Sequence, residues 1–286
     1  MDSILRSTVG TVTLEVRDAD GVLIDADAAP TYAITDAAGT AVKSGTSVKR
    51  GATTGLYDVS LSATDTAALG DYRVAWTVVV SSSTSLPVTR YDVVGGHVFS
   101  LGDLRAFDRS LTSVTNYPAA TLRFARDAAV ERLERAMGVA LTPRGAYEVL
   151  SGNGSTRLML PHVATTALLS VTVDGTAWTA ADVTVLPTGV LVAPEGWVWA
   201  EGDANVVVKY EHGMVTTPEP VRRAAMLLAT EYAVPSALPA RATSQSTESG
   251  YFRLSTADRS GLTGLPEVDA VIAEFGWRRP STGANA

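Results

Sequence analysis

The sequence has no cysteine, few histidines and no long apolar run. The lack of cysteine across all 286 residues excludes disulfides, thiolate metal sites and cysteine nucleophiles. No run approaches the roughly 20 apolar residues that a membrane helix needs, so no membrane association is expected. The first residues, MDSILRSTVG, lack the apolar segment of a signal peptide. We therefore expect synthesis in a reducing cytoplasm.

An excess of basic residues is also missing. The formal net charge is −7, and residues 1–96, with 7 basic and 11 acidic side chains, contribute −4 to it. A protein that grips a phosphate backbone normally has a basic excess. We therefore expect any DNA near this protein to pass without sequence-specific binding. Hydrophobic residues make up 46% of the chain, which is enough for folded cores.

Residues 9–94 show the alternation of half-buried β-strands. Turn residues separate the strands at roughly ten-residue spacing, and no stretch has helical periodicity. The pattern predicts an all-β sandwich for residues 1–95. The positions expected to face its core are Val12, Leu14, Val16, Tyr57, Val59, Leu61, Tyr72, Val74 and Trp76.

Helical patterns begin after residues 95–99, GGHVF, which we interpret as a linker. Ser100 and Asp103 form a capping-box pattern that opens a short helix through about Phe107. Residues 118–138 predict a longer helix that begins at a proline and ends at a glycine. Its expected apolar stripe is Leu122, Ala125, Ala129, Leu133 and Met137, and its expected ion pairs are Arg123–Asp127 and Glu131–Arg135.

Strand patterns return in residues 146–211, with Asp174-Gly175 as a hairpin signal. A second helix is expected over 218–232, with Thr217 as its cap. Its inward positions are expected to be Val221, Ala225, Leu228 and Tyr232. Residues 236–264 are polar and predict an extended arm, and residues 266–276 predict a last short helix.

The order of these elements and several segments point to one family. The segments are LGDLRAF (101–107), YPAATLRFARDAAVERLERAMG (117–138), TPRGAYEVLSG (142–152), LMLPH (158–162), LLSVTVDG (168–175), WAEGDANVVVKYEHG (199–213), PEPVRRAAMLLATEY (218–232) and LTGLPEVDAVIAEFG (262–276). Together, over about residues 97–280, they resemble the head–tail connector (adaptor, or head completion) proteins of tailed bacteriophages. The segments GLYDVSL (55–61) and LGDYRVAWTVVV (69–80) resemble the immunoglobulin-like modules of virion proteins, which are not part of the usual connector core.

The resemblance implies two domains. Residues 1–95 would form the all-β immunoglobulin-like sandwich. Residues 97–235 would form an α+β connector domain, in which helices carry an inserted antiparallel β-sheet. Residues 236–286 would add an extended arm and a short C-terminal helix.

The resemblance also implies a structural virion protein and not an enzyme. Twelve copies would form a ring that joins the capsid portal to the tail and continues the DNA channel. Its partners would be neighbouring copies, the portal protein and a tail-side connector, stopper or tail terminator protein. The chain would be located at the capsid–tail junction after synthesis in the bacterial host.

The residues themselves give no pattern for catalysis, a cofactor or a metal. His97, His162 and His212 lie in no HExxH motif, and we expect linker or turn positions for all three. No GxSxG motif is present, and we expect Glu201 and Asp203 to be solvated turn residues.

Two further motifs have simple interpretations. Asp18, Asp20, Asp25 and Asp27 faintly resemble a calcium loop, but the terminal glutamate of an EF-hand is absent, so a solvated turn is favoured and calcium stays an alternative. Residues 152–154, Gly-Asn-Gly, are expected to form a hairpin turn, because no phosphate-loop lysine follows them.

Eight residues are candidates for contacts between subunits or with tail proteins. Trp197 and Trp199, two residues apart, would share one face of an extended segment and either pack the small sheet or contact a partner. The two arginines of the second helix would face solvent or form intersubunit salt bridges. The aromatic and basic residues in and after the arm would anchor in a partner or pack locally. The two arginines are Arg222 and Arg223. The residues in and after the arm are Phe252, Trp277, Arg278 and Arg279.

Two other functions remain open at this point. A phage or bacterial surface protein could use an immunoglobulin-like module to bind carbohydrate or cells, although the amphipathic helices do not favour this. A tail-associated hydrolase would need a catalytic constellation, and the sequence shows none.

Overall fold

The computed structural model describes residues 2–234, 244–247, 250–253 and 263–277. It is mostly β-sheet, with four α-helices in these ranges. This confirms the coarser part of the fold prediction, a β-rich part followed by an α+β part.

The chain forms two compact units that are discontinuous in sequence. The first contains Met1–Gly96 and Pro143–Gly213, and the second contains His97–Thr142 and Met214–Ala286. The grouping follows contacts and not chain order, so the predicted continuous domain ranges stay a prediction. No helix in the described ranges is long and apolar enough to cross a membrane.

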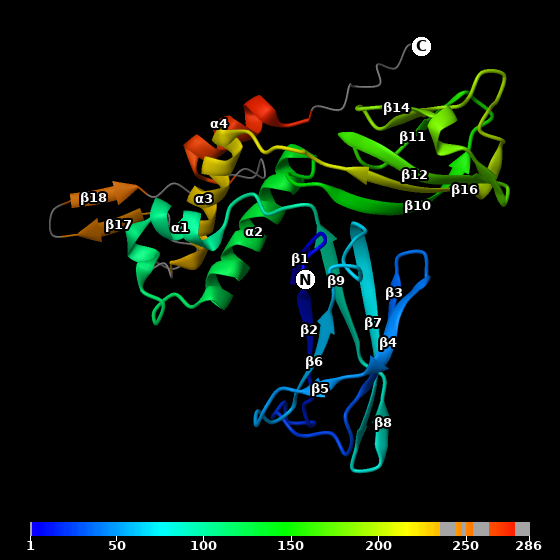
Figure 1. The fold of residues 1–286 in the computed structure, drawn as a ribbon. Coiled ribbons are helices and arrows are strands. Elements are labelled where there is room, and N and C mark those ends of the chain that lie inside the picture. The colour runs from blue at the N-terminus through cyan, green and yellow to red at the C-terminus, as the bar shows by residue number, and fades with distance from the viewer. Residues whose placement is uncertain (1, 235–243, 248–249, 254–262, 278–286) are drawn as a thin grey trace. The chain divides into compact units, whose positions relative to one another are not determined.

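Residues 2–94 of the first unit form two sheets (Figure 1). The larger sheet has the order β1-β9-β7-β3-β4, with β8 beside β7, and the smaller has the order β2-β6-β5. Strand β1 runs parallel to β9, and the other pairs are antiparallel. The strands are β1 Asp2–Leu5, β2 Gly10–Glu15, β3 Thr31–Asp36, β4 Ala41–Thr46, β5 Val48–Lys49, β6 Leu56–Leu61, β7 Gly70–Val80, β8 Ser83–Ser85 and β9 Val88–Val94.

The predicted alternation accounts for the core between these sheets. All nine positions expected to face inward are buried, and they form one cluster with Ile34, Tyr91 and Val93. Side chains two apart on a strand point to the same face, so a period-2 apolar pattern brings both sheets together. The prediction of these strands and of their core is confirmed.

Residues 144–212 of the first unit add two smaller sheets. Their orders are β10-β16-β12-β13 and β11-β15-β14, with all pairs antiparallel. Asp174 and Gly175 both have positive φ and join β12 to β13 as the predicted hairpin. The strands are β10 Arg144–Gly152, β11 Arg157–Met159, β12 Thr165–Val173, β13 Thr176–Trp178, β14 Thr184–Leu186, β15 Val190–Val192 and β16 Gly202–His212, and the 3-10 helix η2 spans Ala180–Asp182.

The hairpin predicted at Gly152-Asn-Gly154 is wrong. Strand β10 pairs with β16 and β11 pairs with β15, so the turn joins strands of different sheets. Gly152 itself ends β10, where a Cβ would lie 1.8 Å from the carbonyl oxygen of Ala200. Close approach of two backbones, and not a two-residue turn, is what requires glycine here.

The helices α1 to α4 belong to the second unit. They are α1 Leu101–Phe107, α2 Ala119–Met137, α3 Glu219–Ala233 and α4 Pro266–Phe275, and the 3-10 helix η1 spans Arg109–Thr112. The predicted stripe of α2 is confirmed, since all five residues are at most 1% exposed. Gly138 ends α2 in the left-handed conformation, with φ of 71°. Two strands inside the predicted arm, β17 Ser244–Thr247 and β18 Gly250–Arg253, form an antiparallel pair.

Several local predictions for these helices need correction. The linker prediction fails at Val98 and Phe99, which are buried, because their apolar side chains pack into the core. Asp127 pairs with Arg126 at 2.9 Å and not with Arg123. Thr217 does not cap α3, because its hydroxyl donates to the carbonyl of Leu141. The pair Glu131–Arg135 is confirmed at 2.6 Å.

The capping box of α1 gives a stability prediction. Ser100 Oγ accepts from the Asp103 amide at 3.0 Å, and the Asp103 carboxylate accepts from the Ser100 amide at 2.9 Å. Ser100→Ala is expected to lower the free energy of unfolding by about 1 kcal/mol, because it leaves a helix N–H without its acceptor. Urea denaturation measures the loss. Ser110→Ala, at an exposed serine in η1, is the control, and an equal loss in both variants would contradict the assignment.

Candidate functional site

A cluster of polar side chains lies where the end of β16 pairs with the start of β10. The β16 residues Val206, Val208, Tyr210 and His212 alternate toward one buried face. Register pairs His212 with Arg144, the first residue of β10. Strand alternation therefore places the His212 imidazole and the Tyr210 phenol on the same side of the sheet.

His162 reaches this cluster from the loop between β11 and β12. Ala164 in that loop has a φ of 54°, and Gly189 packs so closely on the His162 carbonyl that a Cβ would lie 2.4 Å from its oxygen. The loop holds the His162 ring stacked on the His212 ring, with centroids 4.0 Å apart. His162 Nδ1 lies 2.7 Å from the Tyr210 hydroxyl, within hydrogen-bonding distance. Two histidines fifty residues apart in sequence thus meet face to face.

Burial keeps both imidazoles neutral at neutral pH. It lowers the pKa of His212 to about 3, with smaller contributions from the neighbouring His162 ring and the Arg144 guanidinium. It also lowers the pKa of His162, although Glu148, 3.9 Å from His162 Nδ1, acts in the opposite direction. The buried phenol of Tyr210 has a raised pKa, chiefly through desolvation, so it stays protonated. The cluster therefore offers neutral hydrogen-bonding groups.

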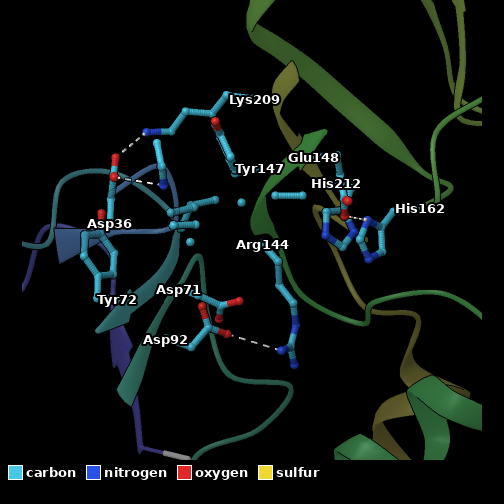
Figure 2. A pocket seen from close by; sticks show the side chains of 16 residues that line it. Asp36, Asp71, Tyr72, Asp92, Arg144, Tyr147, Glu148, His162, Lys209 and His212 are labelled. Carbon is cyan, nitrogen blue, oxygen red and sulfur yellow. Dashed lines mark hydrogen bonds and ion pairs between the residues drawn. The ribbon is translucent and has the colours of Figure 1, made fainter. Parts of the chain in front are cut away.

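A pocket of about 240 Å³ opens beside this cluster, within the first unit (Figure 2). Its other wall comes from β3, β7 and β9 and the loops around them. Two ion pairs join the walls: Arg144–Asp92 at 3.3 Å and Lys209–Asp36 at 3.4 Å. Asp71, Tyr72, Glu148, His162 and His212 also line the pocket. In the described part of the chain, no group of three His, Asp or Glu side chains is placed to hold a metal ion.

The prediction that all three histidines occupy linker or turn positions is wrong for His212. It is the last residue of β16 and is 5% exposed. The signal was present in the sequence, because His212 continues the alternation of Val206, Val208 and Tyr210. Burial lowers the pKa of His97 as well, but that residue belongs to the second unit.

The comparison with known proteins adds no identification. No family model matches the chain, and no curated protein matches it. The connector and immunoglobulin-like resemblances therefore stay predictions.

The segment with the faint calcium-loop pattern, for which a solvated turn was favoured, holds carboxylates that are bonded separately. Asp18 accepts from the amides of Asp20 and Val22. Asp25 pairs with Lys49 at 2.7 Å, and this hydrogen bond is the main cause of the lowered pKa of Asp25. Asp27 accepts from two serine amides of the β7–β8 turn. Three of the four carboxylates, those of Asp18, Asp25 and Asp27, thus have separate structural roles, which favours the turn interpretation.

The structure separates the two predicted tryptophans. Trp199 is fully buried, whereas Trp197 is 53% exposed, because the segment after β15 turns and is not a regular strand. Both rings contact Trp178 of β13, with centroids 5.0 Å away in each case. Trp199 is therefore a core residue of the small sheets, and only Trp197 presents a ring to solvent.

The predicted arginines of α3 are engaged within the second unit. Arg222 pairs with Asp103 at 2.9 Å and with Glu219 at 3.4 Å. Arg223 pairs with Glu267 at 2.8 Å and lies over the Phe107 ring. These contacts link α3 to α1 and α4.

The remaining candidates lie toward the C-terminus. Trp277 is 38% exposed, and its amide donates to the carbonyl of Met137 at 2.7 Å. Phe252 belongs to β18, but its side chain lies outside the described part of the structure. Arg278 and Arg279 also lie outside the described residues.

An exposed aromatic surface on α2 and α3 escaped the sequence analysis. Phe124, in the N-terminal third of α2, is 75% exposed. Tyr232 of α3 is 45% exposed, so the prediction that it faces inward is wrong. Tyr232 lies in the last turn of α3 and lines a groove together with residues of α2, so its ring is only partly covered. The shallow groove, named here the α2–α3 groove, is lined by Phe124, Ala128, Glu131, Arg132, Arg135 and Tyr232.

Proposed function

We propose that this chain is a structural head–tail connector protein of a tailed bacteriophage, without enzymatic activity. The element order supports this: α1 and α2 precede the inserted antiparallel sheets, and α3, a strand pair and α4 follow them. That is the order implied by the resemblance of residues 97–280. The proposed location is the capsid–tail junction of the virion.

The observation that carries the proposal is the α2–α3 groove. The opposite stripe of α2 is fully buried, and the helix would gain little by exposing Phe124 to solvent unless another surface covers this side chain. A ring is a closed assembly in which one surface of each subunit fits a different surface of the next. We assign the groove to the contact with a neighbouring copy, in a ring of twelve.

The remaining proposed partners follow from the position of such a ring. One rim would bind the portal protein, and the other a tail-side connector, stopper or tail terminator protein. With a net charge of −7, the channel would not hold the duplex by phosphate contacts, so DNA would pass through it.

Residues 1–95 are proposed to be an immunoglobulin-like sandwich. The order β4-β3-β7-β9 matches C′-C-F-G of that fold, and β2-β6-β5 matches B-E-D. Near the start of β7, the Tyr72 hydroxyl donates to the carbonyl of Ala68 at 2.8 Å. A tyrosine bonded in this way at the start of strand F is the tyrosine corner of immunoglobulin-like domains.

The alternative, a surface protein that binds carbohydrate through this module, has less support. Sugar-binding surfaces commonly use exposed aromatic rings, which bury large apolar area while keeping a polar edge wet. Tyr57, Tyr72, Trp76 and Tyr91 are all buried, and Tyr32 is half-buried. No aromatic ring in residues 2–96 is fully exposed, so the module offers no such platform.

Phe124→Lys tests the proposal. Lysine keeps the helix propensity of α2, but its charge would be desolvated in a subunit interface. We expect the protein concentration at which the oligomer dissociates to be about tenfold higher or more in the variant than in the wild type. The melting temperature is expected to be unchanged. Light scattering coupled to size exclusion measures this shift, and electron microscopy shows the rings. Val22→Lys, at a 59% exposed valine of the first unit, is the control.

Two results would refute the proposal. One is a wild-type chain that stays monomeric at all concentrations and does not bind a portal protein. The other is localisation of the chain to the capsid lattice or tail fibre in virions.

A further inference from the structure

The pocket of the first unit holds more negative than positive charge. Its carboxylates Asp36 and Asp92 pair with Lys209 and Arg144. Asp71 and Glu148 line the same pocket and have no lysine or arginine partner among the described residues. Glu148 lies 3.9 Å from His162 Nδ1, and burial keeps that imidazole uncharged at neutral pH by lowering its pKa. Two negative charges in the pocket thus lack a full positive partner.

The strand register adds electrostatic repulsion to this excess of negative charge. Asp71 of β7 lies directly opposite Asp92 of β9. Like charges at directly opposed positions of an antiparallel pair destabilise a sheet. The Arg144 guanidinium reaches Asp92, but it is one cation for two facing carboxylates. A further positive group in the pocket would relieve this repulsion.

His212 provides an independent observation at the other end of the pocket. It is 95% buried, lines the pocket, and its Nδ1 has no hydrogen-bond partner in the described structure. A buried polar atom without a partner is costly unless something satisfies it. Figure 2 shows the rings of His212 and His162 together beside Glu148. A neutral imidazole nitrogen that carries no proton accepts hydrogen bonds, as the carboxylates do.

We propose that this pocket binds an organic cation that donates N–H hydrogen bonds, namely an alkylammonium or guanidinium group. Such a group supplies the positive charge that Asp71 and Glu148 lack and the donor that His212 can accept. The volume of about 240 Å³ lies below that of pockets for drug-sized ligands and suits one small chain. A free polyamine and a basic protein side chain share this chemistry.

Titrations of the full chain with two probes test the proposal. Putrescine represents a free polyamine, and N-acetyl-arginine amide represents a basic side chain. At pH 7.5 and low ionic strength, we expect either probe to shift the imidazole NMR signals of His162 and His212. Glu148→Gln and Asp71→Asn should each weaken binding about two- to fivefold, as expected for one charge partner at a partly exposed site. Asp182→Asn, at an exposed acid outside the pocket, should leave binding unchanged.

The outcomes are distinct. Tighter binding of putrescine identifies a polyamine site, and tighter binding of N-acetyl-arginine amide identifies a site for a basic side chain. Unshifted imidazole signals with both probes overturn the proposal. The proposal is also overturned if Glu148→Gln and Asp71→Asn leave probe binding unaltered. It is overturned as well if the imidazole signals shift with Zn²⁺ but with neither probe. The test does not depend on ring formation, so it is independent of the connector proposal.

Discussion

Gly152→Ala is expected to destabilise the first unit by about 3 kcal/mol, because a methyl group at this position has no room. Its Cβ would lie 1.8 Å from the Ala200 carbonyl oxygen and 3.2 Å from the Asn205 amide oxygen. That amide also bridges the two segments, since it accepts from Gly152 N and donates to Ala200 O, both at 2.9 Å. The alanine would therefore push apart a backbone contact and break its bridge.

Urea denaturation followed by tryptophan fluorescence measures this effect, because Trp199 is adjacent to Ala200 and fully buried. Gly96→Ala is the matched control. No atom lies within 4 Å of the Cβ that it would add, and its φ is not positive. A loss of stability in Gly152→Ala no larger than in the control would show that β10 and the segment before β16 do not approach each other closely.

The buried His212 is expected to make the first unit sensitive to acid. An unfolded histidine has a pKa near 6.5, whereas burial lowers the pKa of His212 to about 3. The unfolded chain therefore binds the proton first as the pH falls. The stabilising effect is complete above about pH 6.5 and is lost progressively toward pH 3. Between pH 7 and pH 5 the expected loss from this residue is about 2 kcal/mol.

His212→Phe removes this titration while keeping an aromatic ring against His162. Urea denaturation at several pH values from 7.5 to 5 should show a shallower decline in the variant than in the wild type. These pH values lie above the ordinary range of carboxyl pKa values, so ion pairs such as Lys209–Asp36 contribute little to the difference between the two proteins. Parallel pH curves for the two proteins would contradict the burial of His212. His97 and His162, whose pKa values are also lowered, account for the decline that remains in the variant.

The element pattern is the part of this structure that the sequence predicted best. Strand alternation at Tyr57, Val59 and Leu61, and the three-to-four spacing of Leu122 through Met137, depend only on local periodicity. The capping box at Ser100 and the left-handed glycine at Gly138 are likewise short-range signals. Two errors concerned the partners of single side chains. Asp127 had two arginines in reach and pairs with Arg126, and the hydroxyl of Thr217 donates to the carbonyl of Leu141, which is distant in sequence.

The candidate site was not predictable in the same way. His162 and His212 are distant in sequence. Their rings meet only because β16 pairs with β10 and β12, and because the loop before β12 carries His162 to the end of β16. The facing of Asp71 and Asp92 required the β7–β9 register, which alternation alone does not determine. The exposure of Phe124 depended on which face of α2 the other helices cover.

The sequence by itself thus determined where the chain forms strands and helices, because those preferences arise between residues a few positions apart. Only the tertiary structure decided which strands pair, which polar groups are buried together and which apolar side chains remain uncovered. Each of these depends on contacts between distant segments, whose register and packing no local pattern encodes.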